Sequence, residues 1–199
     1  MVQLATRSGV RLYTNYMRRC DRGVVEVKRR LLHGDIASPI KGVCWYSKGL
    51  FNNGSHFLNL LQFWLGDVKG FEIIDQARLW SGHDPEPDLK VLFEMGKIYF
   101  HVARDENFSY HSVELVAANG RLRLENGNIS WQPTVPDLLN KGYLALNSDG
   151  EVIDSDTGRL QWYVADQIAK DLAGKLTSIC TGDQGLSTLQ VLDQIKQKL

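Results

Sequence analysis

The chain has 199 residues, 43% of them hydrophobic, with 23 basic and 23 acidic side chains. It is long enough to bury a proper core as one domain, or as one large domain with an appendage. The formal net charge of zero excludes the broad positive field with which proteins bind nucleic acid or anionic membranes. No run approaches the ~18 apolar residues of a membrane span, and the first ten residues lack the apolar core of a signal peptide.

The three cysteines, Cys20, Cys44 and Cys180, are far apart and have no C-x-x-C spacing. Their odd number argues against a disulfide framework, and their spacing argues against a zinc site. These features predict a soluble, cytoplasmic protein without a metal.

The first part of the chain predicts two helical segments and two strands. The expected elements are a short helix end over residues 3–8, a strand over 10–17, a helix over 21–32 and a strand over 40–46. A basic run in the helix, at Lys28, Arg29 and Arg30, is expected to be a solvated face.

The most informative helix is predicted from about Asn52, with Asn52 or Asn53 as its N-cap, to Gly66. Steps of ~100° per residue place large apolar residues on one face, namely Phe57, Leu58, Leu60, Leu61, Trp64 and Leu65. The opposite face carries Asn52, Ser55, His56, Asn59, Gln62 and Phe63. A rigidly buried helix can hold an imidazole and amides at fixed positions, as a site requires. The simpler interpretation is an ordinary half-exposed helix, which is the commoner case for a lone histidine.

The loop before this helix has two glycines, Gly49 and Gly54, at the spacing of a phosphate-binding loop. Ser55 and His56 do not supply the Lys and Ser/Thr that such a loop requires, which excludes a nucleotide triphosphatase. The backbone N–H groups at the helix start are still expected to form a modest anion site.

Short strands predominate after Gly66, and the alternation predicts them over residues 71–80, 89–95, 97–104, 111–118, 121–125 and 129–132. Turns at Gly96, Gly120 and Gly127 suit hairpins, so the sheet is expected to be antiparallel. One face is apolar and should be covered by helices, whereas the mixed face should be solvated or packed on a second subunit.

Residues 132–158 predict a surface loop, followed by amphipathic helices over 158–173 and 185–199. Asp154 and Asp156 hint at a calcium loop, but Gly158 and Ala165 stand where ligands are required. The sequence therefore predicts an α+β fold, with an open-faced, mainly antiparallel β-sheet and helices packed on one face.

Two stretches of the sequence resemble the C-terminal domain of the Gfo/Idh/MocA oxidoreductases. The family signature of a Gly, a His and a closing W-L-L-G is matched by Gly54, His56, Trp64, Leu65 and Gly66. The family's "v-N-y-x-R-R" element is matched by Asn15, Tyr16, Arg18 and Arg19. The run KGLFNNGSHFLNLL is most similar to the branch found with enzymes of surface polysaccharide and sugar-nucleotide synthesis. The resemblance covers essentially the whole chain and is strongest over residues 11–66.

The resemblance implies a dihydrodipicolinate-reductase-like C-terminal domain with no Rossmann domain. No G-x-G-x-x-G follows a strand, and the family's E-K-P segment with its catalytic Lys is absent. Residues 1–199 are expected to be one such domain, with residues 1–10 as a remnant of the linker or last helix of the cofactor domain. The chain would then be cut from a longer protein or encoded by a truncated gene, and would be inactive alone.

The resemblance also implies a site. His56 stands where the family has its acid/base histidine, and an imidazole titrating near neutral pH suits that task. Amides, Asn52 and Asn59, replace the aspartates that flank this histidine, and amides cannot share a proton. Contacts to a sugar or nucleotide-sugar substrate are expected from Asn15, Arg18, Arg19, Lys48, Asn52, Asn53 and Asn59. NAD or NADP would be bound by the full-length enzyme and no cofactor by this chain.

The arginine pair, Arg18 and Arg19, could clamp a phosphate or carboxylate. Equally, one arginine could form an intramolecular salt bridge while the other is solvated. Two further functions stay open: a non-catalytic sugar-binding or dimerisation module that homo-oligomerises through the open sheet face, and a hydrolase that pairs His56 with Asp67 or Asp75. The hydrolase lacks a nucleophile motif such as G-x-S-x-G.

Overall fold

The computed structural model describes residues 1–75 and 77–199. Its helices are α1 (Val2–Arg7), α2 (Arg22–His33), α3 (Ser55–Leu65), α4 (Leu160–Leu172) and α5 (Gly182–Lys196). Shorter helical turns are formed by Met17–Cys20, Gly49–Gly54 and Thr157–Arg159. The strands are β1 (Ile40–Tyr46), β2 (Val68–Ile73), β3 (Arg78–Trp80), β4 (Asp84–Glu86), β5 (Leu89–Phe93), β6 (Gly96–Val102), β7 (Ser112–Ala117), β8 (Gly120–Glu125), β9 (Asn128–Pro136), β10 (Leu144–Leu146) and β11 (Glu151–Ile153).

A nine-stranded sheet is the centre of the fold, in the order β10-β9-β8-β7-β1-β6-β5-β2, with β11 beside β9. Among the described strands only β1 and β6 pair in parallel, and all other pairs are antiparallel. The strands β3 and β4 form a separate two-stranded ribbon. The predicted α+β fold with a mainly antiparallel sheet is therefore confirmed.

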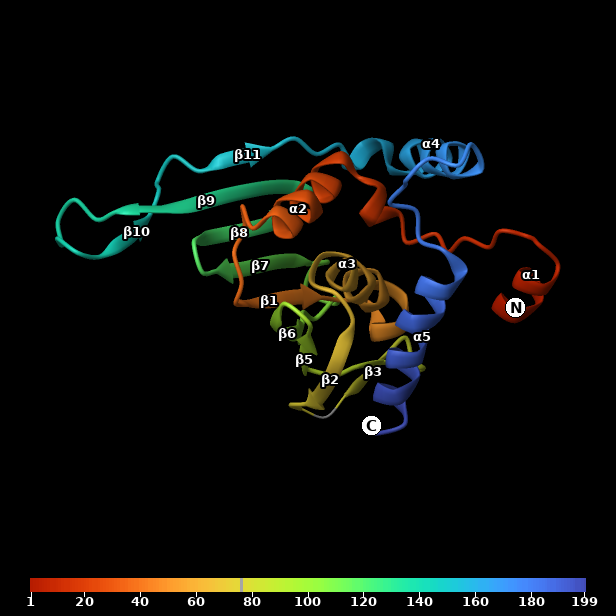
Figure 1. Cartoon of the computed structure of the whole chain (residues 1–199). Coiled ribbons are helices and arrows are strands. Elements are labelled where there is room, and N and C mark those ends of the chain that lie inside the picture. Colours follow the sequence, from red (N-terminus) through yellow and green to blue (C-terminus); the bar gives the residue numbers. More distant parts are fainter. Residues whose placement is uncertain (76) are drawn as a thin grey trace.

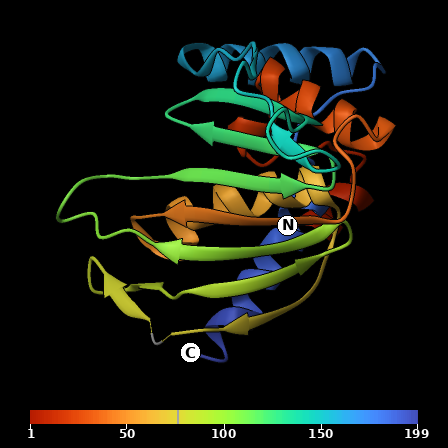
Figure 2. The same ribbon diagram turned by 90° about the vertical axis from the view of Figure 1, so that its left-hand side faces the viewer.

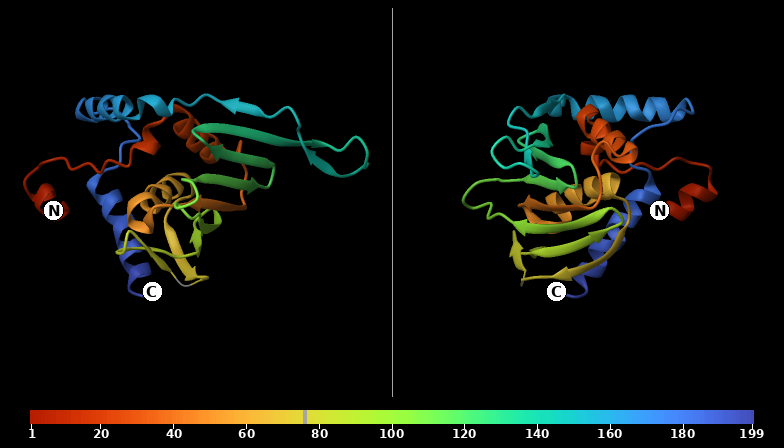
Figure 3. Two further views of the ribbon diagram at one scale, coloured as in Figure 1. Left: turned by 180° about the vertical axis from the view of Figure 1, so that it is seen from behind. Right: turned by 60° about the vertical axis from the view of Figure 1, so that its left-hand side comes forward.

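Helices cover one face of the sheet, as Figure 1 shows for α2, α3 and α5. In Figure 2 the sheet faces the viewer with α3 and α5 behind it. The uncovered face mixes charged residues with half-exposed aromatic ones, among them Trp45, Tyr99 and His101. The hairpin of β9 and β10 projects beyond the sheet as an arm, which is clearest from behind (Figure 3).

The core lies between the sheet and α3. All six apolar residues predicted for the inner face of this helix are at most 2% exposed, which confirms the predicted orientation. The indole Nε1 of Trp64 donates a hydrogen bond of 3.0 Å to the carbonyl of Val24 and so joins α3 to α2. Burial of a large apolar side chain stabilises the fold by about 2 kcal/mol, so α3 is held rigidly.

Three predicted segments differ from the structure. Residues 10–17 form no strand, because their backbone bonds to the segment before α5: Thr14 N donates to Cys180 O at 2.9 Å, and only an isolated bridge joins Tyr13 to Thr181. Residues 132–158 are not a single loop, since β9 runs to Pro136 and pairs with β10 and β11. The predicted strand 71–80 is divided between β2 and β3, and Gln76 lies outside the described residues.

None of the described helices combines the length and the apolar character that crossing a bilayer demands. The three cysteines are buried free thiols. Within the described residues no cluster of three or more His, Cys, Asp or Glu side chains is arranged to hold a metal ion.

Candidate functional site

The helix that carries His56 begins earlier than the sequence predicts. A π-helical turn, Gly49–Gly54, runs directly into α3, and neither Asn52 nor Asn53 caps the helix with its side chain. Lys48 precedes the turn and Gly49 begins it, both with left-handed backbone angles, φ 66° and 85°. The predicted cap is therefore wrong, because the chain is already helical at both asparagines.

Two buried carboxylates of β4 hold this turn. Asp84 accepts hydrogen bonds from the backbone N of Phe51 and of Asn52, each at 2.9 Å, and Glu86 accepts one from Gly49 N at 3.0 Å. These acids satisfy the N–H groups that the start of a helix leaves free, and their charge complements the helix dipole. The anion site predicted at this loop is thus filled by the chain's own acids.

His56 lies in the first turn of α3 against the ring of Tyr16. The ring centroids are 5.2 Å apart and the planes are inclined by 82°. Within the described residues the buried Nδ1 of His56 has no hydrogen-bond partner. Burial, and secondly the positive charge of Arg18, lower the pKa of His56 to about 4. The imidazole is therefore neutral at pH 7, which differs from the expected titration near neutrality.

Arg18 lies beside this histidine. Its Nη2 donates a hydrogen bond of 3.2 Å to Asn53 Oδ1, and its guanidinium carbon lies 4.5 Å from the ring centroid of Phe57. The buried Nε of Arg18 has no partner among the described residues, nor does any described carboxylate form an ion pair with this side chain. A guanidinium without a counter-ion is suited to bind a phosphate or carboxylate of a ligand.

The remaining predicted residues of this region differ in their surroundings. Lys48 forms an ion pair of 3.6 Å with Asp105. Asn52 and Asn15 are exposed. The site also includes a histidine that the sequence did not point to: His111 packs on Phe57 with ring centroids 5.5 Å apart. Burial, then the charges of Arg18 and Lys48, lower the pKa of His111.

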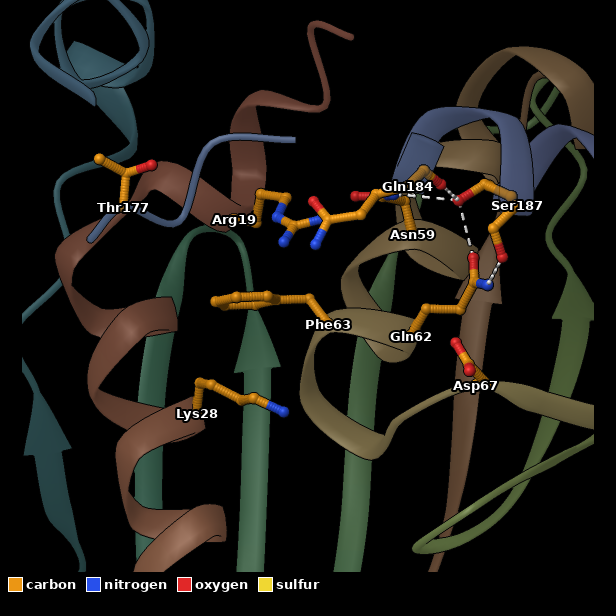
Figure 4. Close-up of a pocket in the computed structure, with 10 residues that line it drawn as sticks. Arg19, Lys28, Asn59, Gln62, Phe63, Asp67, Thr177, Gln184 and Ser187 are labelled. Atoms are coloured by element: carbon orange, nitrogen blue, oxygen red, sulfur yellow. Dashed lines mark hydrogen bonds between the residues drawn. The ribbon is translucent and has the colours of Figure 1, made fainter. Parts of the chain in front are cut away.

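Arg19 and Asn59 face a different part of the molecule. Arg19 is 5% exposed, and its Nε donates a hydrogen bond of 2.7 Å to the carbonyl of Ser178. Asn59 is 2% exposed, and its Nδ2 donates one of 3.0 Å to Thr188 Oγ1. Both line a cavity of about 310 Å³ between α2, α3 and α5 (Figure 4). Arg18 and Arg19 therefore do not act together as the predicted clamp. Arg18 lies over Phe57, whereas Arg19 lies over Phe63 on another side of α3.

A histidine–carboxylate pair for hydrolysis is not formed with Asp67. This residue follows α3, and the nine residues of helix from Phe57 to Leu65, at about 1.5 Å each, separate it from His56 by roughly 14 Å. Asp84 and Glu86 contact the turn that precedes α3, but both already accept backbone hydrogen bonds there. The sequence analysis did not identify Asp84 and Glu86 of β4 as residues that hold this turn. Their only signal in the sequence is the alternation of acids and prolines in DPEP.

Comparisons by sequence give no relative, because neither a family model nor a curated protein matches. Solved structures match by fold. An NAD-binding oxidoreductase from Klebsiella pneumoniae matches with a TM-score of 0.73 and 14% identity, over 96% of this chain and 65% of the other. An aldose-aldose oxidoreductase from Caulobacter crescentus matches with a TM-score of 0.72 and 15% identity, over 98% of this chain and 64% of the other. The WlbA dehydrogenase from Bordetella pertussis, solved in complex with NADH and UDP-GlcNAcA, matches with a TM-score of 0.66 and 14% identity. This match covers 98% of this chain and 64% of the other.

These structures are oxidoreductases of the Gfo/Idh/MocA type. The chain spans about 65% of the length of the first of them. At this level of identity the likeness concerns the fold. The chain therefore has the fold of a large part of these NAD-binding oxidoreductases, which confirms at the level of the fold the resemblance recognised in the sequence.

Proposed function

We propose that this chain is the substrate-binding and oligomerisation domain of an NAD(P)-dependent sugar or nucleotide-sugar dehydrogenase of the Gfo/Idh/MocA family. One observation carries the proposal: a neutral imidazole, His56, and a guanidinium without a counter-ion, Arg18, lie together at the start of the helix that bears the family's signature.

The chemistry would be oxidation of a hydroxyl of the sugar to a carbonyl, or its reverse. NAD(P), when bound by the full-length enzyme, would supply the hydride acceptor or donor. The hydroxyl proton would pass to His56 at Nε2, since Nδ1 is buried. Arg18 would bind an anionic group of the substrate and so neutralise the positive charge that lowers the pKa of His56. Substrate binding would thereby bring the imidazole closer to the neutral range in which a general base works best.

A nucleotide sugar is the favoured substrate class. The WlbA dehydrogenases from Bordetella pertussis and Chromobacterium violaceum were solved with NADH and UDP-GlcNAcA. The phosphates and the carboxylate of such a ligand would suit Arg18 and the ammonium of Lys48. We further propose that the domain acts in the cytoplasm, in the biosynthesis of surface polysaccharides, because residues 48–61 resemble that branch of the family. Contacts from Asn15, Asn52 and Asn53 complete the proposed site.

Oligomerisation would use the uncovered face of the sheet. Trp45, Leu92 and Val116 are 38%, 40% and 53% exposed there. Large apolar side chains on an otherwise charged surface are typical of protein interfaces.

The proposal is tested by calorimetric titration of the chain with UDP-GlcNAcA, NADH and NADPH, together with its mass in solution. We expect the nucleotide sugar to bind, the dinucleotides not to bind, and the mass to be that of an oligomer. Arg18→Gln should weaken the nucleotide sugar about tenfold through loss of a charge-assisted contact, whereas Arg22→Gln, an exposed control, should not. Tight binding of NADH would contradict the assignment of a separate cofactor domain.

A non-catalytic sugar-binding or dimerisation module is the second candidate. It is favoured by Asn52 and Asn59, since amides replace the aspartates that accompany the family's histidine. His56→Ala distinguishes the two: in the full-length enzyme it should lower the catalytic rate with the fold intact, whereas a module would keep its ligand and its oligomeric mass.

A further inference from the structure

A second polar cavity lies between α2, α3 and α5. Its volume is about 310 Å³, and none of Tyr16, Arg18 and His56 lines it. The cavity is therefore separate from the proposed dehydrogenase site. Arg19 and Asn59, which the sequence assigned to that site, line this cavity instead.

One side of the cavity carries two cations on a single aromatic ring. The guanidinium carbon of Arg19 lies 4.4 Å from the ring centroid of Phe63, and Nζ of Lys28 lies 5.8 Å from it. Figure 4 shows the two side chains on either side of the Phe63 ring. The sequence predicts Lys28 on a solvated face, but it is half-buried here because its stem packs towards α3.

Neither cation has a counter-ion among the described residues. Arg19 donates to the carbonyl of Ser178 and lies beside the thiol of Cys180. Among the described residues neither Arg19 nor Lys28 forms an ion pair within 4.0 Å, although Glu94 attracts Lys28 from a longer distance. The one carboxylate that lines the cavity belongs to Asp67, which is exposed. A charge removed from water is costly unless it is paired, and two such charges repel each other. An anion in the cavity, beside the ring of Phe63 rather than directly between the two cations, would offset both costs.

The opposite wall is polar and firmly held. Gln62 Nε2 donates to Ser187 Oγ at 3.4 Å, and Thr188 Oγ1 donates to Gln62 Oε1 at 2.7 Å. Asn59 Oδ1 is buried without a hydrogen-bond partner in the described part of the chain. Figure 4 shows Gln62, Gln184 and Ser187 across the cavity from Phe63. The Ser187 hydroxyl and the Gln184 amide can donate to an oxyanion that the cations hold, whereas Asn59 Oδ1 only accepts and would take a hydrogen bond from a hydroxyl of the ligand.

We propose that this cavity is a second ligand site, which binds the phosphate or carboxylate group of a small molecule between Arg19, Lys28 and the first turns of α5. The volume of about 310 Å³ is near the lower end for small-molecule pockets. It suits a phosphate ester or a short dicarboxylate and is too small for a dinucleotide. The site goes beyond the proposed dehydrogenase function, because neither Arg18 nor His56 lines this cavity.

Calorimetric titration at low salt with inorganic phosphate, and separately with succinate, tests this site. In Arg18→Gln, which lacks the guanidinium of the proposed substrate site, we expect one saturable site per chain for at least one of these probes, and the better probe identifies the oxyanion. Lys28→Gln should weaken binding about tenfold, the value of one charge-assisted contact. Lys41→Gln, which removes an exposed lysine of β1, should leave binding unchanged, and so should His56→Ala.

Arg19→Gln should abolish binding, but Arg19 is 5% exposed and its replacement can disturb the fold. Circular dichroism shows whether that variant is folded, and Lys28→Gln tests the site independently of it. Absence of saturable binding of both probes to the wild type would overturn the proposal. So would equal binding by wild type and Lys28→Gln. If the probe binds His56→Ala as tightly as it binds the wild type, binding at this cavity does not depend on the proposed dehydrogenase site. Each of the two proposals can then fail without the other.

Discussion

The edge of one aromatic ring covers the candidate base: Tyr16 and His56 have ring centroids 5.2 Å apart and planes inclined by 82°. Tyr16 belongs to the extended segment before the turn Met17–Cys20, and His56 belongs to the first turn of α3. The contact therefore joins the two stretches that carry the family resemblance. It also contributes to the burial that lowers the pKa of the imidazole.

Acid should destabilise the protein through His56. Its pKa is about 4 in the folded chain, against the ordinary 6.5 when unfolded. Between these values the unfolded chain binds more protons, so stability should fall as the pH is lowered from about 6.5 to about 4. The expected loss is about 2 kcal/mol after allowance for partial screening by solvent. Urea unfolding of wild type and His56→Gln at pH 7 and pH 4 measures it. Equal losses in both proteins would exclude His56 as the cause.

Removal of the Arg18 charge should raise the pKa of His56. Burial is the larger cause of the lowered pKa and Arg18 the smaller one, so Arg18→Gln should recover only part of the shift. An NMR titration of the imidazole signals in wild type, Arg18→Gln and Arg22→Gln checks this. We expect a higher pKa in the first variant only. An identical pKa in all three proteins would show that the guanidinium does not act on the imidazole.

Gly49 should tolerate no side chain. Its φ is +85°, and an added Cβ would overlap the carboxylate of Asp84. Gly174 provides a matched control, with φ +74° and open space around it. Gly49→Ala should cost about 3 kcal/mol or more, whereas Gly174→Ala should cost about 1 kcal/mol from the backbone alone. Thermal or urea unfolding compares the two, and equal costs would contradict the close approach of Asp84.

Asp84 should stabilise the start of the site helix. Asp84→Asn removes the charge and replaces one acceptor oxygen by a donor that faces a backbone N–H. A cost of about 2 kcal/mol is expected, with a loss of protection of the Phe51 and Asn52 amides in hydrogen exchange. Asp149→Asn, on an exposed turn, should change stability by less than about 0.5 kcal/mol. Unaltered amide protection in Asp84→Asn would show that the turn is held by other contacts.

The sequence predicts regular elements of this fold well, because their apolar periodicity survives in each element alone. The six inner residues of α3 and the strands β5 to β8 are examples. The strand predicted over residues 10–17 is wrong. The alternation of apolar and polar residues suits a strand, but it does not reveal that the backbone of this segment bonds to an irregular segment before α5 and not to another strand. The strands β10 and β11 escape prediction because they are largely exposed and carry no apolar alternation.

The site is predicted only in part for a similar reason. The resemblance of two short motifs to the oxidoreductase family points to His56 and Arg18 as site residues. It cannot show that Arg18 and Arg19 point to opposite sides of α3, since a tight helical turn separates consecutive side chains by a large angle. His111 precedes β7, and Asp84 and Glu86 lie in β4, so only the tertiary fold brings these residues to the start of α3.

The most direct test of the central claim is an NMR titration of the chain with the nucleotide sugar at pH 7, observed through the histidine imidazoles. His33 and His83 are exposed and serve as internal controls. We expect the His56 signals to shift saturably, with a rise in the pKa of His56 as the ligand anion neutralises Arg18, while the control signals stay fixed. Binding that leaves His56 unmoved would contradict the claim that α3 presents the substrate site.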